Sequence, residues 1–152
     1  MKTHGSAVWS GGIKDGKGAI STKSGALQAY PYGFSSRFEG KAGSNPEELI
    51  GAAHAACFTM ALSLILGEAG LTADRMETTA EVTLEKVSDG FAITAVHLTL
   101  KAKIPGADDG RARFLDEGRP GHCRALRMVD VAHRLRVAFG SESLDLVERE
   151  LR

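Results

Sequence analysis

The longest hydrophobic run of the chain lies within residues 44–70, and its pattern predicts a helix. The apolar side chains of this run do not follow one stripe but cover every face of a helical projection, which is typical of a buried helix. Ser44 or Asn45 can cap its start, and Pro46 suits the first helical position. Gly70 is a natural stop.

A helix that is hydrophobic all round must be covered on every side. About 24 residues extend about 36 Å along a helix axis, which is long for one small domain to wrap. A second subunit is the simplest cover, so we predict an obligate homodimer. The most apolar part, residues 50–66, contains His54 and is shorter than the roughly 20 apolar residues of a membrane span. We therefore expect a buried core helix and no membrane contact.

Segments of alternating or β-branched residues on both sides of the helix predict strands. Gly-rich turns separate three short candidates within residues 1–43; they are residues 7–9, 18–22 and 34–38. After the helix, a turn at residues 88–90 joins two longer runs and predicts a hairpin over residues 75–103.

The signals weaken after residue 106. Residues 114–117 and 123–131 have helical character, and residues 135–139 fit a closing strand. A helix and a strand within residues 107–152 would complete one α+β domain over residues 1–152. A chain of 152 residues is long enough to bury a core of its own.

The charge pattern argues against several kinds of partner. Acidic and basic residues balance at 19 each, so no overall field favours nucleic acid or an anionic membrane surface. Beyond residue 110 the lysines give way to arginines, but acidic residues are interleaved and no aromatic platform accompanies them. We expect no nucleic-acid partner; the alternative, a nucleic-acid-binding tail, would show an affinity that falls steeply with salt.

Two cysteines, Cys57 and Cys123, are too few for a disulfide scaffold in a chain of this length. The polar first residues show no signal-peptide pattern, so we expect a cytoplasmic protein. In that compartment a pair of thiols suggests redox or metal chemistry rather than a permanent cross-link. Taken alone, a buried cysteine such as Cys57 would be interpreted as a small hydrophobic residue.

A reactive Cys57 needs a positive charge from elsewhere. Cysteine reacts as the thiolate, which an apolar helix disfavours unless a cation is near. Cys57 lies about three turns past the helix start, beyond the reach of the helix dipole. Arg37 stands between apolar neighbours on a predicted strand, and a guanidinium keeps its charge when buried. Glu47 could orient it by a bidentate pair, although Glu47 also suits the first turn of the helix simply as a dipole partner.

Three segments of the chain resemble the osmotically inducible protein C and organic hydroperoxide resistance (OsmC/Ohr) family, and more closely its OsmC branch. The most specific is NPEEL at residues 45–49 followed by AAHAACF at residues 52–58. The others are PYGFSSRFEG at residues 31–40 and GFAIT at residues 90–94. The resemblance is good over roughly residues 5–106.

The resemblance implies a thiol peroxidase that reduces organic hydroperoxides. Cys57 matches the family's peroxidatic cysteine, which becomes a sulfenic acid, and Cys123 is identified as the resolving cysteine that forms a disulfide with it. Arg37 and Glu47 match the family's charged partners. The family also implies an intertwined α+β homodimer, with antiparallel sheets around long central helices and active sites at the subunit interface. It implies no bound cofactor, and an external dithiol reductant such as a lipoylated protein.

The chain departs from the family pattern at its second cysteine. The family usually shows Gly-Cys-Pro there, whereas this chain has Gly121-His122-Cys123-Arg124. The change bears on the local geometry of Cys123 and on the rate at which a disulfide forms. It keeps an alternative open, namely a related protein that binds a hydrophobic ligand or senses redox state and turns over little.

The spacing of Glu47 and Cys57 makes a prediction about subunits. Ten residues of continuous helix separate two positions by about 15 Å, so the two side chains cannot share a site within one chain unless the helix breaks. We hypothesise that Arg37 and Glu47 of one subunit serve Cys57 of the other, with the two central helices antiparallel.

A zinc site is the remaining alternative for the thiols. Two cysteines with His54 and His122 could form a tetrahedral set, but the short Cys-x-x-Cys pairs of structural zinc are missing from the sequence. A metal bound to the thiolate would also abolish peroxidase chemistry. We therefore expect no metal and interpret His54 as a packed residue at the dimer interface.

Overall fold

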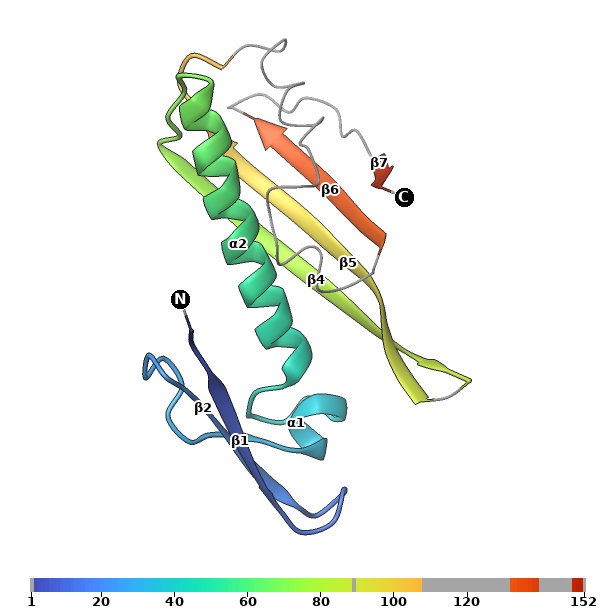
Figure 1. The fold of residues 1–152 in the computed structure, drawn as a ribbon. Helices are drawn as coiled ribbons and strands as arrows, with labels where there is room; N and C mark the ends of the chain where they lie inside the picture. The colour runs from blue at the N-terminus through green and yellow to red at the C-terminus, as the bar shows by residue number, and fades with distance from the viewer. Residues whose placement is uncertain (1, 89, 108–131, 140–148, 152) are drawn as a thin grey trace. The chain divides into compact units, whose positions relative to one another are not determined.

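The computed structural model describes residues 2–88, 90–107, 132–139 and 149–151 (Figure 1). Its contacts divide the chain into two compact units, residues 1–49 and 50–152. Antiparallel strands and one long helix give the α+β class that the sequence predicts. The single domain expected over the whole chain stays a prediction.

The N-terminal unit is built on a small antiparallel sheet with the strand order β1-β2-β3. Trp9 and Tyr32 pack with their ring centroids 5.5 Å apart. Gly16 and Gly18 lie beneath these rings, where a Cβ atom would clash with them, so glycine permits the close approach. The strands are β1 (Gly5–Ser10), β2 (Lys17–Thr22) and β3 (Tyr30–Tyr32).

The expected strand at residues 34–38 is wrong: this segment forms the short helix α1 (Phe34–Phe38). The Ser36 hydroxyl accepts a hydrogen bond from the Gly33 N–H at 3.0 Å, which satisfies an amide at the helix start. The rings of Phe34 and Phe38 pack one turn apart, with centroids at 4.9 Å, as side chains at i and i+4 do. Two apolar residues four apart fit a helical turn as well as a strand.

The long predicted helix is present as α2 (Pro46–Glu68). Asn45 caps it, because its Oδ1 accepts the Glu48 N–H at 2.8 Å. Gly70, with φ of 70°, ends it as predicted. The Leu71 N–H reaches back to the Leu66 carbonyl and the Gly70 N–H to the Gly67 carbonyl, the hydrogen-bond pattern of a Schellman motif.

The C-terminal unit is a sheet with the order β4-β5-β6-β7, and α2 lies across one face of it (Figure 1). β4 and β5 form the predicted hairpin, and β6, parallel to β5, contains the predicted closing strand. The helices expected at residues 114–117 and 123–131 lie outside the described residues. The strands are β4 (Arg75–Val87), β5 (Gly90–Lys103), β6 (Ala132–Phe139) and β7 (Arg149–Leu151).

The hairpin contains one register shift. Thr83 pairs with Ala95 but Leu84 pairs with Ile93, so Thr94 is an extra residue on β5. Because alternate residues of a strand face opposite sides, the shift is what lets Ile93 and Val96, three residues apart, both face the side of the sheet that carries α2.

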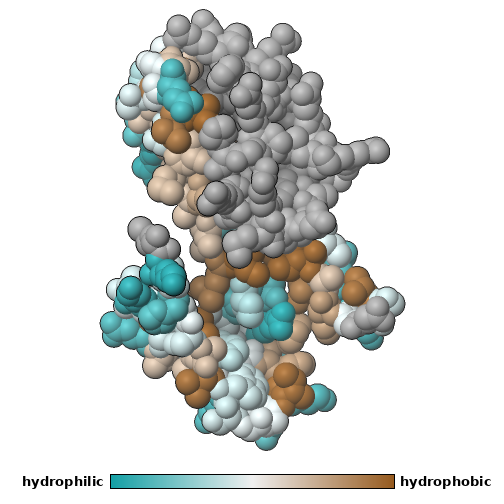
Figure 2. Space-filling view, viewed as in Figure 1, coloured by the Kyte–Doolittle hydropathy of each residue, from teal (hydrophilic) through white to brown (hydrophobic). Residues whose placement is uncertain are grey.

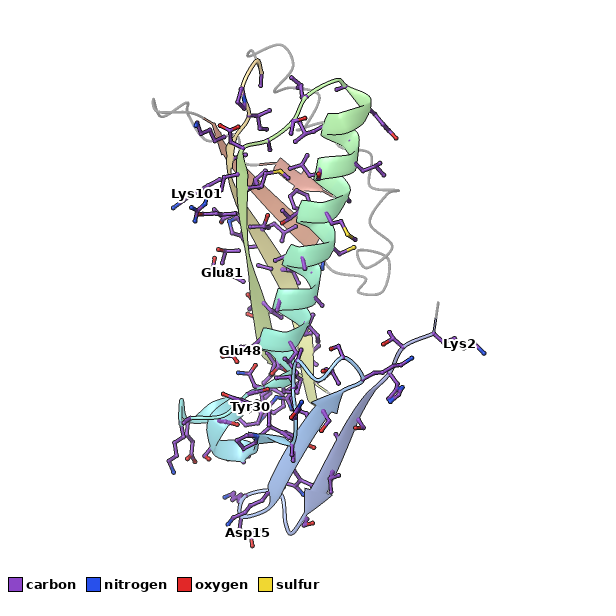
Figure 3. All side chains as sticks on the ribbon, turned by 90° about the vertical axis from the view of Figure 1, so that its left-hand side faces the viewer. Lys2, Asp15, Tyr30, Glu48, Glu81 and Lys101 are labelled. Atoms are coloured by element: carbon purple, nitrogen blue, oxygen red, sulfur yellow. The ribbon has the colours of Figure 1, made fainter. Side chains whose placement is uncertain are left out.

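The core of this unit lies between α2 and the hairpin. Apolar side chains alternate with polar ones along β5, and Glu81 and Lys101 point away from α2 (Figure 3). Burial of these apolar groups is the main favourable term for the packing. The buried cluster consists of Leu62, Leu66, Leu71, Leu100 and Ile104.

Much of α2 is exposed in the described part of the chain. By length and composition alone it could cross a membrane, a test that the core helix of a soluble protein also passes. Only 22% of its most apolar window is buried. Hydrophobic side chains reach the surface of the molecule (Figure 2), and Met60 and Leu64 are among those exposed.

Candidate active site

The described site residues belong to two different units of the chain. Arg37 and Glu47 belong to the N-terminal unit, and Cys57 belongs to the C-terminal unit. Cys123 and His122 lie outside the described residues. Within the N-terminal unit, the structure brings Arg37 and Glu47 together.

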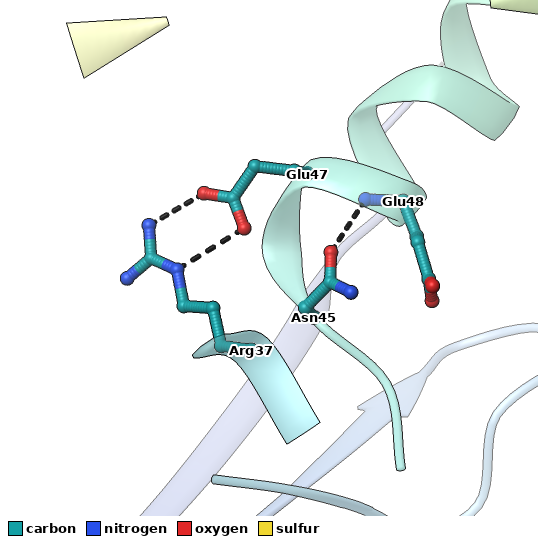
Figure 4. A network of polar contacts seen from close by, with 4 residues as sticks. All are labelled: Arg37, Asn45, Glu47 and Glu48. Carbon is teal, nitrogen blue, oxygen red and sulfur yellow. Dashed lines mark hydrogen bonds and ion pairs between the residues drawn. The ribbon is translucent and has the colours of Figure 1, made fainter. Parts of the chain in front are cut away.

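Arg37 and Glu47 form a two-pronged ion pair (Figure 4). Arg37 Nε donates to Glu47 Oε2 at 3.1 Å and Nη2 donates to Oε1 at 2.5 Å. Such a pair fixes the plane of the guanidinium as well as its position. Arg37 also lies over the Phe38 ring, with Cζ 5.1 Å from the centroid. The negative face of the ring attracts the positive charge of the guanidinium.

The burial of the pair is uneven. The Glu47 side chain is 13% exposed and the Arg37 side chain 34%. The carboxylate is thus held within the protein, while part of the guanidinium remains open to solvent. Nη1 of Arg37 has no hydrogen-bond partner among the described residues, and these N–H groups are available to an anion or to an oxygen atom.

Glu47 is held by the start of α2. It lies in the first turn, where the helix dipole also favours a carboxylate. Glu47 is therefore both the ion-pair partner of Arg37 and a partner of the helix dipole. The preceding backbone is tied down, because the Ser44 N–H donates to the Pro31 carbonyl at 2.9 Å. The carboxylate is therefore positioned by backbone that is itself bonded to the sheet.

Cys57 lies on the middle of α2 and is half-buried. The helix is fixed to β4 on both sides of it. Gly51 approaches the Ala80 carbonyl so closely that a Cβ would lie 3.0 Å from that oxygen, and the Thr59 hydroxyl bonds to the Thr78 hydroxyl at 2.6 Å. The position of the thiol relative to the sheet is set by these contacts.

The residues around Cys57 along the helix differ in burial. His54, one turn earlier, is 2% exposed, so it is packed within this chain; its expected place at a dimer interface stays a prediction. Phe58 packs against the buried core cluster. Met60, one turn later, is 72% exposed. The thiol therefore stands at the border between the covered and uncovered sides of α2.

α2 is continuous between Glu47 and Cys57. No cluster of three or more His, Cys, Asp or Glu that could hold a metal occurs in the described part of the chain. The zinc alternative also needs His122 and Cys123, which lie outside the described residues, so the expectation that no metal binds stays a prediction.

Sequence reasoning missed Ser36, whose hydroxyl binds backbone groups on both sides of it. A glycine followed three residues later by serine is a possible signal for a local cap at a helix start, and the strand assignment of this segment hid it. Thr59 and Thr78 were missed as well, and they lie on different elements with no local signal.

Residues 38–137 match the family described as OsmC-like protein. The chain is 62% identical over 104 residues to the Escherichia coli (strain K12) protein named Peroxiredoxin OsmC, covering 68% of this chain and 73% of that protein.

Solved structures agree on the fold. The organic hydroperoxide resistance protein OhrB of Bacillus subtilis matches with a TM-score of 0.64 and 25% identity, over 88% of this chain and 97% of that chain. An OsmC-like protein from Mycoplasma pneumoniae matches with a TM-score of 0.71, over 91% and 97% of the two chains. At 14% identity the latter supports the fold alone.

Proposed function

Because its sequence matches the OsmC-like family model over residues 38–137, the chain belongs to the OsmC-like protein family, and we propose that it is a cysteine-based peroxidase of organic hydroperoxides. The name of the E. coli relative, a peroxiredoxin, and the organic hydroperoxide resistance protein of B. subtilis support this reaction class. The observation that carries the proposal is the Arg37–Glu47 pair, which keeps a fixed cation partly open to solvent.

The proposed reaction has two steps. The Cys57 thiolate attacks one oxygen of the hydroperoxide, the O–O bond breaks, and the alkoxide leaves as alcohol after taking up a proton. Cys57 is then a sulfenic acid. The thiol of Cys123 attacks the Cys57 sulfur, a disulfide forms and water leaves; an external dithiol, such as a lipoylated protein, returns both cysteines to thiols. No bound cofactor takes part.

Arg37 has a specific task in this scheme. Glu47 engages the Nε edge of the guanidinium, which leaves the Nη1 edge to face the reacting atoms. A fixed donor there stabilises the thiolate and the negative charge that develops on the leaving oxygen. Glu47 orients Arg37 and does not itself react.

We further propose that the site is completed by a second subunit. On the exposed side of α2, small or flexible residues recur at seven-residue spacing and form one line along the helix, here called the seam. Such a pattern suits packing against a second helix at a shallow crossing angle. Arg37 and Glu47 of one subunit would then serve Cys57 of the other. The exposed seam consists of Ala53, Ala56, Met60, Ser63 and Gly67.

The first test measures consumption of cumene hydroperoxide with dihydrolipoamide as reductant, for the wild type and for Cys57→Ser. We expect rapid loss of the organic peroxide that depends on Cys57, and slower loss of hydrogen peroxide. Full activity of Cys57→Ser would exclude the mechanism. Slow oxidation of Cys57 without turnover would favour the alternative of a redox sensor or hydrophobic-ligand-binding protein.

The shared site can be tested by complementation. Cys57→Ser and Arg37→Met, each inactive alone, are produced together so that mixed dimers form. A mixed dimer has one site with both groups intact if the site is shared between subunits, so activity returns to up to about a quarter of the wild-type level. Activity that stays at the level of the separate variants would show that each subunit uses its own Arg37.

The dimer itself is tested by light scattering after size exclusion. Met60→Glu places a charge on the seam and should yield monomers. Lys101→Glu, on the sheet face away from α2, is the control that should remain dimeric. A dimeric Met60→Glu would place the subunit contact elsewhere.

A further inference from the structure

The hydroxyl of Ser36 connects two backbone segments of the N-terminal unit. It accepts the Gly33 N–H at 3.0 Å, and it lies within hydrogen-bond distance of two carbonyl oxygens, of Gly33 at 3.1 Å and of Ser44 at 2.9 Å. A hydroxyl has one proton to donate, so the two carbonyls share it. Its hydrogen bonds therefore span from the start of α1 to the residue before the cap of α2.

The junction around Ser36 leaves little room. Gly43 has φ of 138°, and a Cβ on it would lie 2.8 Å from Ser36 Cβ, so glycine lets the two segments touch. Ser44 is 6% exposed and its N–H is bonded to the Pro31 carbonyl. The approach to α2 is thus fixed against both the sheet and α1.

These two segments carry the two halves of the ion pair. Arg37 follows Ser36 directly on α1, and Glu47 follows Ser44 by three residues, in the first turn of α2. A bidentate pair depends on the distance and angle between the two backbone segments that carry its side chains, called its supports below. The bond from Ser36 to the Ser44 carbonyl is a direct link between these supports.

We propose that Ser36 is a positioning residue for the peroxidase reaction, because it holds the supports of Arg37 and Glu47 at the spacing that their bidentate pair requires. The proposal rests on the proposed function. Ser36 does not itself contact the reacting atoms, and it acts through the orientation of the Arg37 guanidinium.

A positioning role can be separated from a merely structural one by a double-mutant cycle. Ser36→Ala is prepared in the wild type and in Arg37→Met. The readout is the single-turnover rate constant for oxidation of Cys57 by cumene hydroperoxide, which does not depend on the fraction of molecules that are folded. Unfolding by urea is measured on the same four proteins.

Ser35→Ala is the matched control. It removes the same atom one residue earlier on α1, and no hydrogen bond of the Ser35 hydroxyl is found among the described residues. We expect an oxidation rate within about twofold of the wild type, because no bond to either support is lost.

We expect Ser36→Ala to slow the oxidation of Cys57 on the order of tenfold in the wild type, comparable with the loss of one or two hydrogen bonds. In the Arg37→Met background it should have no further effect. An equal loss in both backgrounds, or no loss in the wild type, would overturn the proposal. Should Ser36→Ala not fold, Ser36→Thr, which keeps the hydroxyl, should oxidise Cys57 faster than Ser36→Gly, and equal rates would overturn it.

The same double-mutant cycle distinguishes a failure of the role proposed for Ser36 from a failure of the proposed function. If Arg37→Met oxidises Cys57 as fast as the wild type, the role given to Arg37 fails, and Ser36 has nothing to position. If Arg37→Met is slow but Ser36→Ala is not, only the role of Ser36 fails.

Discussion

The two sides of α2 are similar in composition and different in surroundings. The side that faces the hairpin is buried, while the opposite side is exposed although it is also apolar. Hydrophobicity alone therefore does not tell which side of a helix its own chain covers. The buried side holds Gly51, His54, Leu62 and Leu66, and the exposed side holds Ala53, Ala56, Met60 and Leu64.

The largest difference between the two sides is expected for a pair of leucines. Leu66 is 1% exposed and Leu64 is 59% exposed. Leu66→Ala leaves a cavity and should lower the free energy of unfolding by about 2–5 kcal/mol, whereas Leu64→Ala should cost less than about 1 kcal/mol. Urea unfolding at low protein concentration measures both. Equal losses would mean that a second subunit covers Leu64 as fully as the sheet covers Leu66.

Two glycines on the same helix sharpen the comparison. A Cβ on Gly51 would lie 3.0 Å from the Ala80 carbonyl oxygen, whereas no described residue beyond the helix's own adjacent backbone lies within 4 Å of one on Gly67. Gly51→Val should therefore cost about 1–3 kcal/mol through overpacking within one subunit. In the monomeric Met60→Glu background, which removes any effect of the proposed seam, Gly67→Val should change the free energy of unfolding by at most about 0.5 kcal/mol. Thermal unfolding of both variants is the measurement, and a harmless Gly51→Val would contradict the close approach.

A polar contact on the buried side has a smaller expected effect. Thr59→Val removes the bond to Thr78 while keeping the shape of the side chain, so we expect a loss of about 1 kcal/mol. Because Thr78→Val breaks the same bond, the double variant should cost less than the sum of the two single variants. Strict additivity would show that the two hydroxyls are not coupled.

The smallest effect is expected at an exposed ion pair on the edge of the hairpin. A hydrogen bond and the charge of Asp74 raise the pKa of Lys103 above its usual 10.5. A raised pKa stabilises the fold below the unfolded-state value and is lost as the pH rises through the folded-state value. Any difference between wild type and Asp74→Asn should therefore shrink above pH 10.5 in urea unfolding; a difference that grows there would contradict the pairing. Both side chains are largely solvated, so we expect little change at pH 7.

The boundaries of α2 could be predicted because local chemistry sets them. Asn45 caps the start and Gly70 ends the helix by its left-handed conformation, and both are visible as single letters in the sequence. The strand predicted at residues 34–38 was wrong because the four-residue spacing of Phe34 and Phe38 fits both the two-residue period of a strand and the 3.6-residue period of a helix. The hydrogen bond from the Gly33 N–H to the Ser36 hydroxyl favours the helical turn. The order of strands after β5 depends on contacts between distant segments, which have no local pattern.

In the candidate site, too, some features could be predicted from the local sequence and others depend on contacts that only the fold shows. The charges of Arg37 and Glu47 suggested their pairing, and the pair is present, although Arg37 stands on a helix and not on the expected strand. The hydroxyls that hold the supports could not be chosen from the sequence, because serine is common in turns and only the fold shows which carbonyl it reaches. Cys57 was singled out by its motif, and the contacts that fix its helix come from β4.

The extra residue in β5 can be lost without changing which side chains of the hairpin face α2. Thr94 is exposed, and it stands between Ala95, which pairs with Thr83, and Ile93, which pairs with Leu84. Deleting it would place Ile93 and Val96 two residues apart, so both would still face the same side of a regular strand. A deletion of one codon there should therefore reduce the local twist that a bulge adds, whereas neither arm of the hairpin would turn over.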